Sequence, residues 1–318
     1  MAEPIIRVED IAWARLRSPD LDKQEEFLTN FGMVRAERTA DKLFMRGTDP
    51  DHHLHVTEKG DPKVVGLAFY ADSVDDLKRL AKMAPGASEV EDIDEPGGGK
   101  RVRLTEPNGY QIEIVTGIEK VKPLKAREAV LNWGDAKYRR AGDLMRLDPG
   151  PSHVKRCGHG VFGTPKLKES IAWIRHHIGL IGSDDVYAGD KDNVILSFNR
   201  INRGKEYVDH HVFLYVQAER GGFNHVSYEV QDIDDVVMGH EHLMGMDKYE
   251  HMWGLGRHVL GSQIYDYWCD PWGRVHEHWT DTDVLNIDYG SRIVAAEEGL
   301  RSQWGEGPPD RFIHHLST

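Results

Sequence analysis

A stretch near the C-terminus combines residue types that bind metals and move protons. Residues 256–279 read GRHVLGSQIYDYWCDPWGRVHEHW and place His258, Tyr267 and Glu277 at intervals of nine and ten residues. Between Tyr267 and Glu277 lies Asp270-Pro-Trp-Gly273, whose proline and glycine favour a turn. The alternating flanks predict a hairpin. An imidazole, a phenol and a carboxylate along one hairpin could bind a cation and a hydroxylated ligand together.

Internal repeats predict the elements that position this hairpin. VVGLAFYADSVDDLKRL (64–80) and FNHVSYEVQDIDDVVMG (223–239) each predict a strand, a polar turn and a helix that begins at Asp-Asp. SPDLDKQEEFLTNFGM (18–33) and TPKLKESIAWIRHHIGL (164–180) each predict a turn and an amphipathic helix that ends at glycine. We therefore expect four units, each a strand, a helix and three further strands.

These units fall into two halves, which predicts an α+β fold with two domains. The expected N-terminal, non-catalytic domain covers residues 1–140, and the expected C-terminal, catalytic domain covers residues 150–285. Between them, Asp148-Pro-Gly-Pro ends in prolines that resist a continuous helix or strand. Residues 286–318 form a tail, for which we expect a role as a lid or as an interface.

Equivalent positions of the two halves should differ where only one half has a chemical function. Alignment of the repeats gives three pairs, named from the second half to the first: His225 with Gly66, His159 with Ala12 or Trp13, and Glu277 with Glu113. Two histidines and a carboxylate on one face of a metal ion leave its other face open, as in non-haem Fe(II) oxygenases. The sequence therefore predicts one metal ion per chain, in the second half.

Residues 150–285 resemble the catalytic half of the type I extradiol ring-cleavage dioxygenases, in the vicinal oxygen chelate superfamily. The family pattern of Gly-x-His, a spacer, Tyr, an acidic residue, Pro-x-Gly and Glu is matched by residues 256–277. Asp266 departs from the pattern, because the family usually carries an apolar side chain before the tyrosine. The paired units extend the resemblance over 1–285, which implies paired βαβββ modules in each domain and a metal site in the C-terminal domain.

The resemblance also implies the metal and its ligands. His159, His225 and Glu277 match the ligands of an Fe(II) ion, and Mn(II) suits the same set. His211, about fourteen residues before His225, matches a catalytic histidine that handles protons. His210 is the alternative for that role.

Four further positions carry expected contacts with substrate. His258 and Tyr267 match a catalytic pair that hydrogen-bonds the substrate oxygens. Trp253 stands where some relatives carry arginine, and we expect Trp253 and Trp268 to contact the substrate as well.

The implied function is that of an extradiol dioxygenase in aromatic catabolism. Such an enzyme inserts both atoms of O2 into a substituted catechol and cleaves the ring next to the diol. Two alternatives stay open: a non-oxygenase metalloenzyme of the superfamily (a glyoxalase-like isomerase or a thiol transferase), and a metal-free small-molecule binding protein. A single-ring catechol with an alkyl, carboxyl or extra hydroxyl group is the favoured substrate.

Composition excludes several partners. The formal net charge is −13, and no dense Lys/Arg cluster could follow a phosphate backbone, so we expect no nucleic acid partner. No apolar run approaches the length of a membrane span, and the two cysteines cannot form a disulfide framework. We expect a cytoplasmic protein, and the resemblance implies a homo-oligomer, either a tetramer or a dimer.

The other histidines and the tail complete the expectations. His240, His242 and His251 are predicted to be surface or helix residues without a catalytic role. His276 and His278 flank Glu277 and are predicted to be solvated or to lie just behind the ligands. In the tail, Arg292, Arg301 or Arg311 could meet an acidic substituent of the substrate, with Trp304 and Phe312 as anchors.

Overall fold

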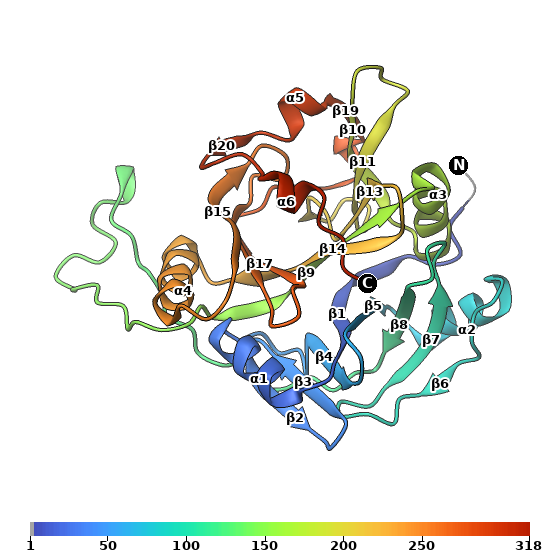
Figure 1. Ribbon diagram of the computed structural model, residues 1–318, viewed down its shortest axis with the longest axis horizontal. Helices are drawn as coiled ribbons and strands as arrows, with labels where there is room; N and C mark the ends of the chain where they lie inside the picture. The colour runs from blue at the N-terminus through green and yellow to red at the C-terminus, as the bar shows by residue number, and fades with distance from the viewer. Residues whose placement is uncertain (1–2) are drawn as a thin grey trace.

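The computed structural model describes residues 3–318, whose strands form two large sheets (Figure 1). The first sheet contains β1 (Val8–Ser18), β2 (Val34–Arg38), β3 (Lys42–Arg46), β4 (His55–Lys59), β5 (Lys63–Ala71), β6 (Glu91–Asp92), β7 (Lys100–Thr105) and β8 (Gln111–Thr116). Its strand order is β2-β3-β4-β1-β5-β8-β7-β6. The first half of the chain therefore forms one sheet of its own.

The second sheet is built from residues 154–304. It contains β9 (Val154–Thr164), β10 (Ile181–Tyr187), β11 (Val194–Arg200), β13 (Phe213–Gln217), β14 (Gly222–Val230), β15 (His251–His258), β16 (Ile264–Cys269), β17 (Val275–Thr280), β19 (Arg292–Ala295) and β20 (Ser302–Trp304). Its order is β19-β10-β11-β13-β9-β14-β17-β16-β15-β20. The short strands β12 (Val208–Asp209) and β18 (Val284–Leu285) pair separately.

One helix follows the first strand of each unit. These helices are α1 (Leu21–Asn30), α2 (Val74–Met83), α3 (Leu167–Ile178) and α4 (Ile233–Met246). The resulting order of strand, helix and three strands of the same large sheet occurs four times in the chain, with the short β12 inserted between β11 and β13 in the third unit. The predicted α+β fold of paired βαβββ modules is confirmed. The domain limits of 1–140 and 150–285 stay a prediction.

Local sequence explains where these helices begin and end. The side chain of Asp232 caps α4 by accepting from the backbone N–H of Asp235, and Ser73 caps α2 by accepting from that of Asp76. Helix α3 ends at Gly179, whose φ of 77° favours glycine. The Asp-Asp pairs of the repeats thus lie in the first turn of α2 and α4, just after the caps, and the terminal glycine ends α3.

The largest hydrophobic core contains buried residues of both halves, from Ile5 to Trp268. Polar contacts join the halves as well: His278 Nε2 donates to the carbonyl of Phe31 at 2.6 Å, and Tyr228 bonds His55 at 2.7 Å. His276 and His278 are fully buried in this contact. The prediction that these two are solvated or lie behind the ligands is wrong, because alternation turns both away from Glu277 and into the interface.

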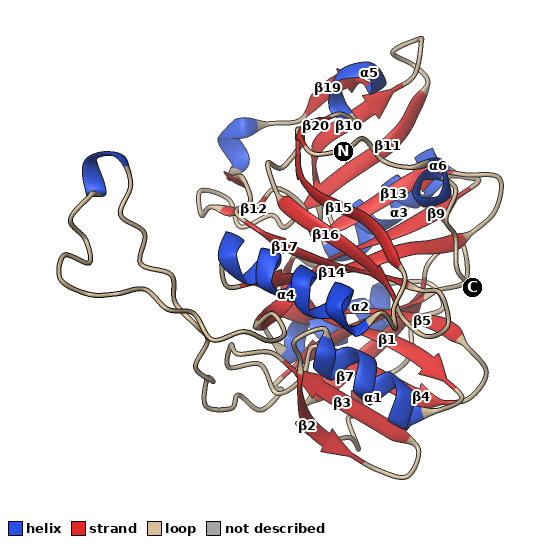
Figure 2. Ribbon diagram, turned by 60° about the vertical axis from the view of Figure 1, so that its left-hand side comes forward, coloured by secondary structure: helices blue, strands red, loops and turns tan. Residues whose placement is uncertain are grey.

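The segment between the halves extends away from the body of the molecule (Figures 1 and 2). It carries the short 3-10 helix η1 (Gly134–Ala136), and the side chains of Trp133 and Tyr138 are exposed. Arg127 fixes its base by bonding Asp235 at 2.7 Å. Across residues 3–318, none of the helices combines the length and apolar character needed to cross a bilayer.

Candidate metal centre and cavity

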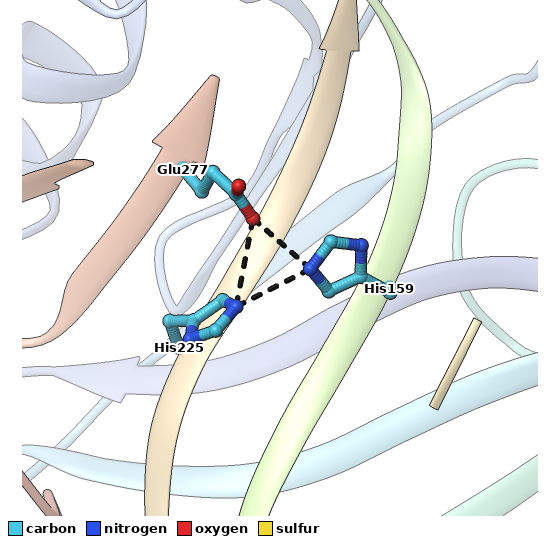
Figure 3. Close-up of side chains that lie close together, drawn as sticks. All are labelled: His159, His225 and Glu277. Atoms are coloured by element: carbon cyan, nitrogen blue, oxygen red, sulfur yellow. Dashed lines mark hydrogen bonds and ion pairs between the residues drawn. The ribbon is translucent and has the colours of Figure 1, made fainter. Parts of the chain in front are cut away.

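His159, His225 and Glu277 lie on three adjacent strands, β9, β14 and β17 (Figure 3). Ser227 of β14 pairs with His159 on one side and with Glu277 on the other. His225 lies two residues before Ser227, and alternate residues of a strand share one face of the sheet. The strand register therefore directs the three side chains to one face.

The donor atoms of the three residues converge on one point. The Nε2 atom of His159 lies 3.2 Å from Nε2 of His225 and 3.0 Å from Oε2 of Glu277. The Nε2 atom of His225 lies 3.5 Å from the same carboxylate oxygen. Ligand bonds of about 2.1 Å put neighbouring donors about 3 Å apart in an octahedral site. The spacing therefore suits one divalent ion.

The hydrogen bonds of this cluster leave lone pairs free for a cation. Nδ1–H of His225 donates to Oδ1 of Asn224 at 2.6 Å, which puts the lone pair of the ring on Nε2. The Glu277 carboxylate is fully buried, and within residues 3–318 neither of its oxygens accepts a hydrogen bond of normal geometry. A buried anion without such partners is costly unless a cation binds it. The three residues therefore fit a metal ion, and their role as its ligands stays a prediction.

Burial and charge set the ionisation states that metal binding needs. Burial lowers the pKa of His225 to about 3, so its imidazole is neutral at pH 7. Burial alone would raise the pKa of the Glu277 carboxyl, but the neighbouring His159 and His258 hold this pKa well below its usual range. A neutral imidazole therefore lies beside an ionised carboxylate.

His211 packs against the same cluster and is held from behind by a chain of buried hydrogen bonds. Its ring centroid lies 4.3 Å from that of His159, and its Nδ1 lies 3.0 Å from Nδ1 of His210. The Nε2 atom of His210 lies 2.7 Å from Oδ2 of Asp184, and Arg292 donates to the other oxygen of Asp184 at 2.9 Å. His211 therefore lies nearer the candidate ligands, and His210 lies between it and Asp184.

His258 and Tyr267 lie on neighbouring strands at the side of the cluster. The Nε2 atom of His258 lies 3.0 Å from the Tyr267 hydroxyl and 3.7 Å from Oε1 of Glu277. The ring of Trp253 stacks on Tyr267, with centroids 5.2 Å apart and planes 8° apart. The side chains of Trp253, His258 and Tyr267, which were predicted to contact substrate, are therefore in contact with one another.

A cavity of about 900 Å³ opens above the three candidate ligands. Six predicted site residues line it: His159, His211, His225, Trp253, His258 and Tyr267. Much of its remaining wall is aliphatic, from residues such as Val161, Leu196 and Leu214. Glu219 and Arg220 add charged groups to the lining. The cavity therefore offers apolar surface beside a polar, metal-binding floor.

The prediction that Trp268 contacts substrate is wrong. Trp268 follows Tyr267 directly on β16, so the two side chains point to opposite faces of the sheet. Trp268 is fully buried, and its indole Nε1–H donates to Asp266 at 2.5 Å. Its ring packs near His240 of α4, away from the cavity.

The tail also reaches the cavity, through its last short helix, α6 (Asp310–Ile313). Phe312 lies 4.7 Å from Tyr267 between ring centroids, and Leu316 lines the cavity with it. Arg292 binds Asp184 instead, and Arg311 pairs with Glu250. The suggestion that a tail arginine meets the substrate is therefore not supported, since the lining cation is Arg220.

Sequence reasoning missed two contributors to this site. Asn224 precedes His225 directly, and this adjacency is visible in the sequence. Asp184 stands 26 residues before His210, and no local pattern links the two. Phe312 was expected to anchor the tail, and the path of the tail brings it to Tyr267.

In the first half, a guanidinium group takes the place of a metal. Arg15 Nε lies 2.8 Å from Oε1 of Glu113, the counterpart of Glu277. Gly66 occupies the position in the first half that is equivalent to that of His225 in the second. A Cβ atom at Gly66 would lie 1.7 Å from the carbonyl oxygen of Gln111. A metal-binding side chain at residue 66, such as a histidine or a carboxylate, would therefore require the backbone to shift.

Comparison with known proteins supports this description of the fold. Residues 10–114 match the family model of the Glyoxalase/Bleomycin resistance protein/Dioxygenase superfamily. Metapyrocatechase 2 of Cupriavidus necator is 29% identical over 325 aligned residues, which span 100% of this chain and 95% of that relative. The similarity to this relative therefore includes both halves and the tail.

Two solved structures share the architecture. Homoprotocatechuate 2,3-dioxygenase of Arthrobacter globiformis superimposes with a TM-score of 0.80 at 18% identity, over 100% of this chain and 94% of that one. The Mn(II)-bound glyoxalase of Novosphingobium aromaticivorans gives 0.79 at 23% identity, over 98% and 96%. At these identities the superpositions establish a common fold.

Proposed function

We propose that this chain belongs to the Glyoxalase/Bleomycin resistance protein/Dioxygenase superfamily and is an extradiol dioxygenase that cleaves a substituted catechol next to its diol. The observation that carries the proposal is the convergence of three buried donors, from His159, His225 and Glu277, on a cavity that also contains His211, His258 and Tyr267. The similarity to a metapyrocatechase over the whole chain supports it.

His159, His225 and Glu277 would hold the metal ion, and we propose Fe(II), with Mn(II) as the other suitable ion. Two imidazoles and one carboxylate suit both ions. The ion would supply Lewis acidity and electron transfer between a diol and dioxygen. The chain itself fixes the ligand geometry through the register of β9, β14 and β17.

Proton transfer follows from the chain of hydrogen bonds behind His211. If Nε2–H of His210 donates to ionised Asp184, Nδ1 of His210 carries a lone pair and accepts from Nδ1–H of His211. The Nε2 atom of His211 is then a free base. In the cavity it can take a proton from a catechol hydroxyl and return it to a reduced oxygen later in the reaction.

His258 and Tyr267 would orient the diol. Their Nε2 and hydroxyl groups are hydrogen-bonded to each other at 3.0 Å and both line the cavity, so two neighbouring substrate oxygens can bind them by replacing this bond. Burial raises the pKa of Tyr267, which keeps its hydroxyl protonated and available as a donor. Trp253 and Phe312 pack against Tyr267 and restrict its ring.

The cavity wall favours a catechol with an apolar substituent. Burying apolar surface contributes about 25 cal/mol per Å², and the aliphatic side chains of Val161, Leu196 and Leu214 provide such surface. An alkyl- or aryl-substituted catechol would gain this energy, whereas a carboxylate would be desolvated against the same wall. Arg220 is the cation that could offset that cost for a carboxylated substrate.

The test uses enzyme loaded anaerobically with Fe(II) or Mn(II) and a panel of catechols with alkyl, aryl and carboxyl substituents. We expect oxygen uptake and a ring-opened, coloured product, fastest with an apolar substituent. Glu277→Gln should lose both the ion and the activity, while Glu241→Gln, at an exposed position of α4, should keep both. Isomerisation of a thiohemiacetal without oxygen uptake would instead indicate a glyoxalase-like enzyme.

A further inference from the structure

A second group of potential metal ligands lies on the opposite face of the sheet from the cavity. His240 of α4, His251 of β15 and Asp266 of β16 each offer one ligand atom within 4.8 Å of the others. Asp266 precedes Tyr267 on its strand, so its side chain points away from the cavity. The two groups of ligands are therefore separated by the sheet.

Both imidazoles of this group are directed at one carboxylate oxygen. Nε2 of His251 lies 2.7 Å from Oδ1 of Asp266, and Nδ1 of His240 lies 3.1 Å from the same atom. Donors bound at about 2.1 Å in a tetrahedral site are about 3.3 Å apart. A shift of the His251 ring by about half an ångström would give that spacing. The side chains of His240 and His251 are 21% and 23% exposed, so the cluster is open to solvent and ions.

The carboxylate itself is fixed in the manner of a metal ligand. Asp266 is fully buried, and its Oδ2 accepts from the indole N–H of Trp268 at 2.5 Å. Hydrogen bonds of this kind hold the non-coordinating atom of a ligand and orient the coordinating one. A Cβ atom at Gly254 would lie 2.7 Å from Oδ1, so the glycine leaves this oxygen accessible.

We propose that His240, His251 and Asp266 bind a second divalent ion, of the class that prefers imidazole and carboxylate ligands, such as Zn²⁺. One water molecule from solvent completes a four-coordinate site. This site gives a role to Asp266, which occupies a position where extradiol dioxygenases usually carry an apolar residue. It goes beyond the single ion that the sequence predicts, and it does not depend on the proposed reaction.

The ion would join α4 to the β15–β16 hairpin. The same hairpin carries Trp253 and His258 on β15 and Tyr267 on β16. Metal binding at this position therefore stabilises the strands that carry the substrate-binding side chains, without contact with the cavity.

The test measures Zn²⁺ per chain after equilibration with Zn²⁺ alone and dialysis against metal-free buffer. We expect two ions for the wild type, one for Glu277→Gln and one for the double variant His240→Gln/His251→Gln. His242→Gln is the matched control, because His242 also lies on α4 but bonds Asn30 at 2.9 Å. This control should bind two ions.

Thermal unfolding gives a second readout, which does not need the variant His240→Gln/His251→Gln. Zn²⁺ should raise the Tm of Glu277→Gln, and this rise should be lost when His251→Gln is added, with folding checked by circular dichroism. Equal zinc content in the wild type and in His240→Gln/His251→Gln would overturn the proposal. So would a Glu277→Gln protein that holds no zinc and shows no change in Tm.

Discussion

His211 is joined to a buried carboxylate by two successive hydrogen bonds, and this connection distinguishes it from the other histidines. The path runs from His211 to His210 and then to Asp184, whose other oxygen binds Arg292. Burial and the neighbouring His159 and His210 lower the pKa of His211 well below its usual range, so its ring is neutral before substrate binds. The neutral ring therefore keeps the lone pair of Nε2 unprotonated on the side of the cavity.

We predict that His211→Asn slows ring opening by about 10²-fold, the usual scale for losing a positioned acid–base group. Metal content and anaerobic catechol binding, followed by absorbance, should change little, because neither depends on the missing proton acceptor. His210→Gln should have a smaller effect on turnover and should alter its pH profile, since His210 acts on His211 and does not touch the substrate. If His210→Asn abolished turnover while His211→Asn preserved it, the two roles would be exchanged.

At the scale of elements, the strands and helices follow from the repeats, because alternation and helix caps are local properties. Aligned repeats also predict which strands carry His159, His225 and Glu277, and register then brings these residues together. Contacts between distant segments could not be predicted in this way. The approach of Phe312 to Tyr267 depends on how residues 286–318 cross the molecule, which no periodic pattern records.

The direction of single side chains was predictable in part. Tyr267 and Trp268 are consecutive in a strand, so only one of them could face the cavity. The burial of His276 and His278 was not predictable, because it results from packing against α1 and its C-terminal Phe31. His240 and His251 are unremarkable in the sequence and meet only because α4 covers β15 and β16.

The tail provides the prediction at this scale. Phe312→Ala should raise KM for an apolar catechol several-fold, because Phe312 lines the cavity and packs on Tyr267. Metal content should stay unchanged: the Phe312 ring lies 5.7 Å from that of His225, but Asn224 still fixes the imidazole and the donor atoms are retained. Trp304→Ala is the matched control, since Trp304 belongs to the same tail but is 44% exposed and does not appear in the cavity lining. Equal KM values for both variants, measured by oxygen uptake, would limit the tail to a structural role.

At the scale of the whole molecule, the two halves balance a buried carboxylate in different ways. Glu113 is neutralised by Arg15, whereas Glu277 faces two imidazoles that carry no obligatory charge. The same fold therefore uses a fixed cation in one half and presents lone pairs for a metal in the other. This difference supports our proposal that the first half has a structural role and the second a chemical one.

The fixed cation, Arg15, also pairs with Glu95 at 2.9 Å, and this ion pair predicts a pH dependence of the free energy of unfolding. Burial would raise the pKa of Glu95, but Arg15 and Lys42 lower it from 4.5 to about 2. A depressed carboxyl pKa contributes stability above the unfolded value, here about 3 kcal/mol, and loses it as pH falls from 4.5 towards 2. Glu95→Gln should therefore reduce the free energy of unfolding at pH 7 and much less at pH 2, where the carboxyl is largely protonated in the unfolded state and half protonated in the folded one. Urea titrations that give the same loss at both pH values would contradict this origin.

The central claim is that the cluster of His159, His225 and Glu277 enables the chain to insert both atoms of dioxygen into a catechol. The most direct measurement is a single-turnover reaction of Fe(II)-loaded enzyme with an alkyl-substituted catechol under ¹⁸O₂, followed by mass spectrometry of the ring-opened product. The account predicts two labelled oxygen atoms in each product molecule from the wild type, and no product from Glu277→Gln. A product with one labelled atom or none, or label incorporation that survives Glu277→Gln, would contradict it.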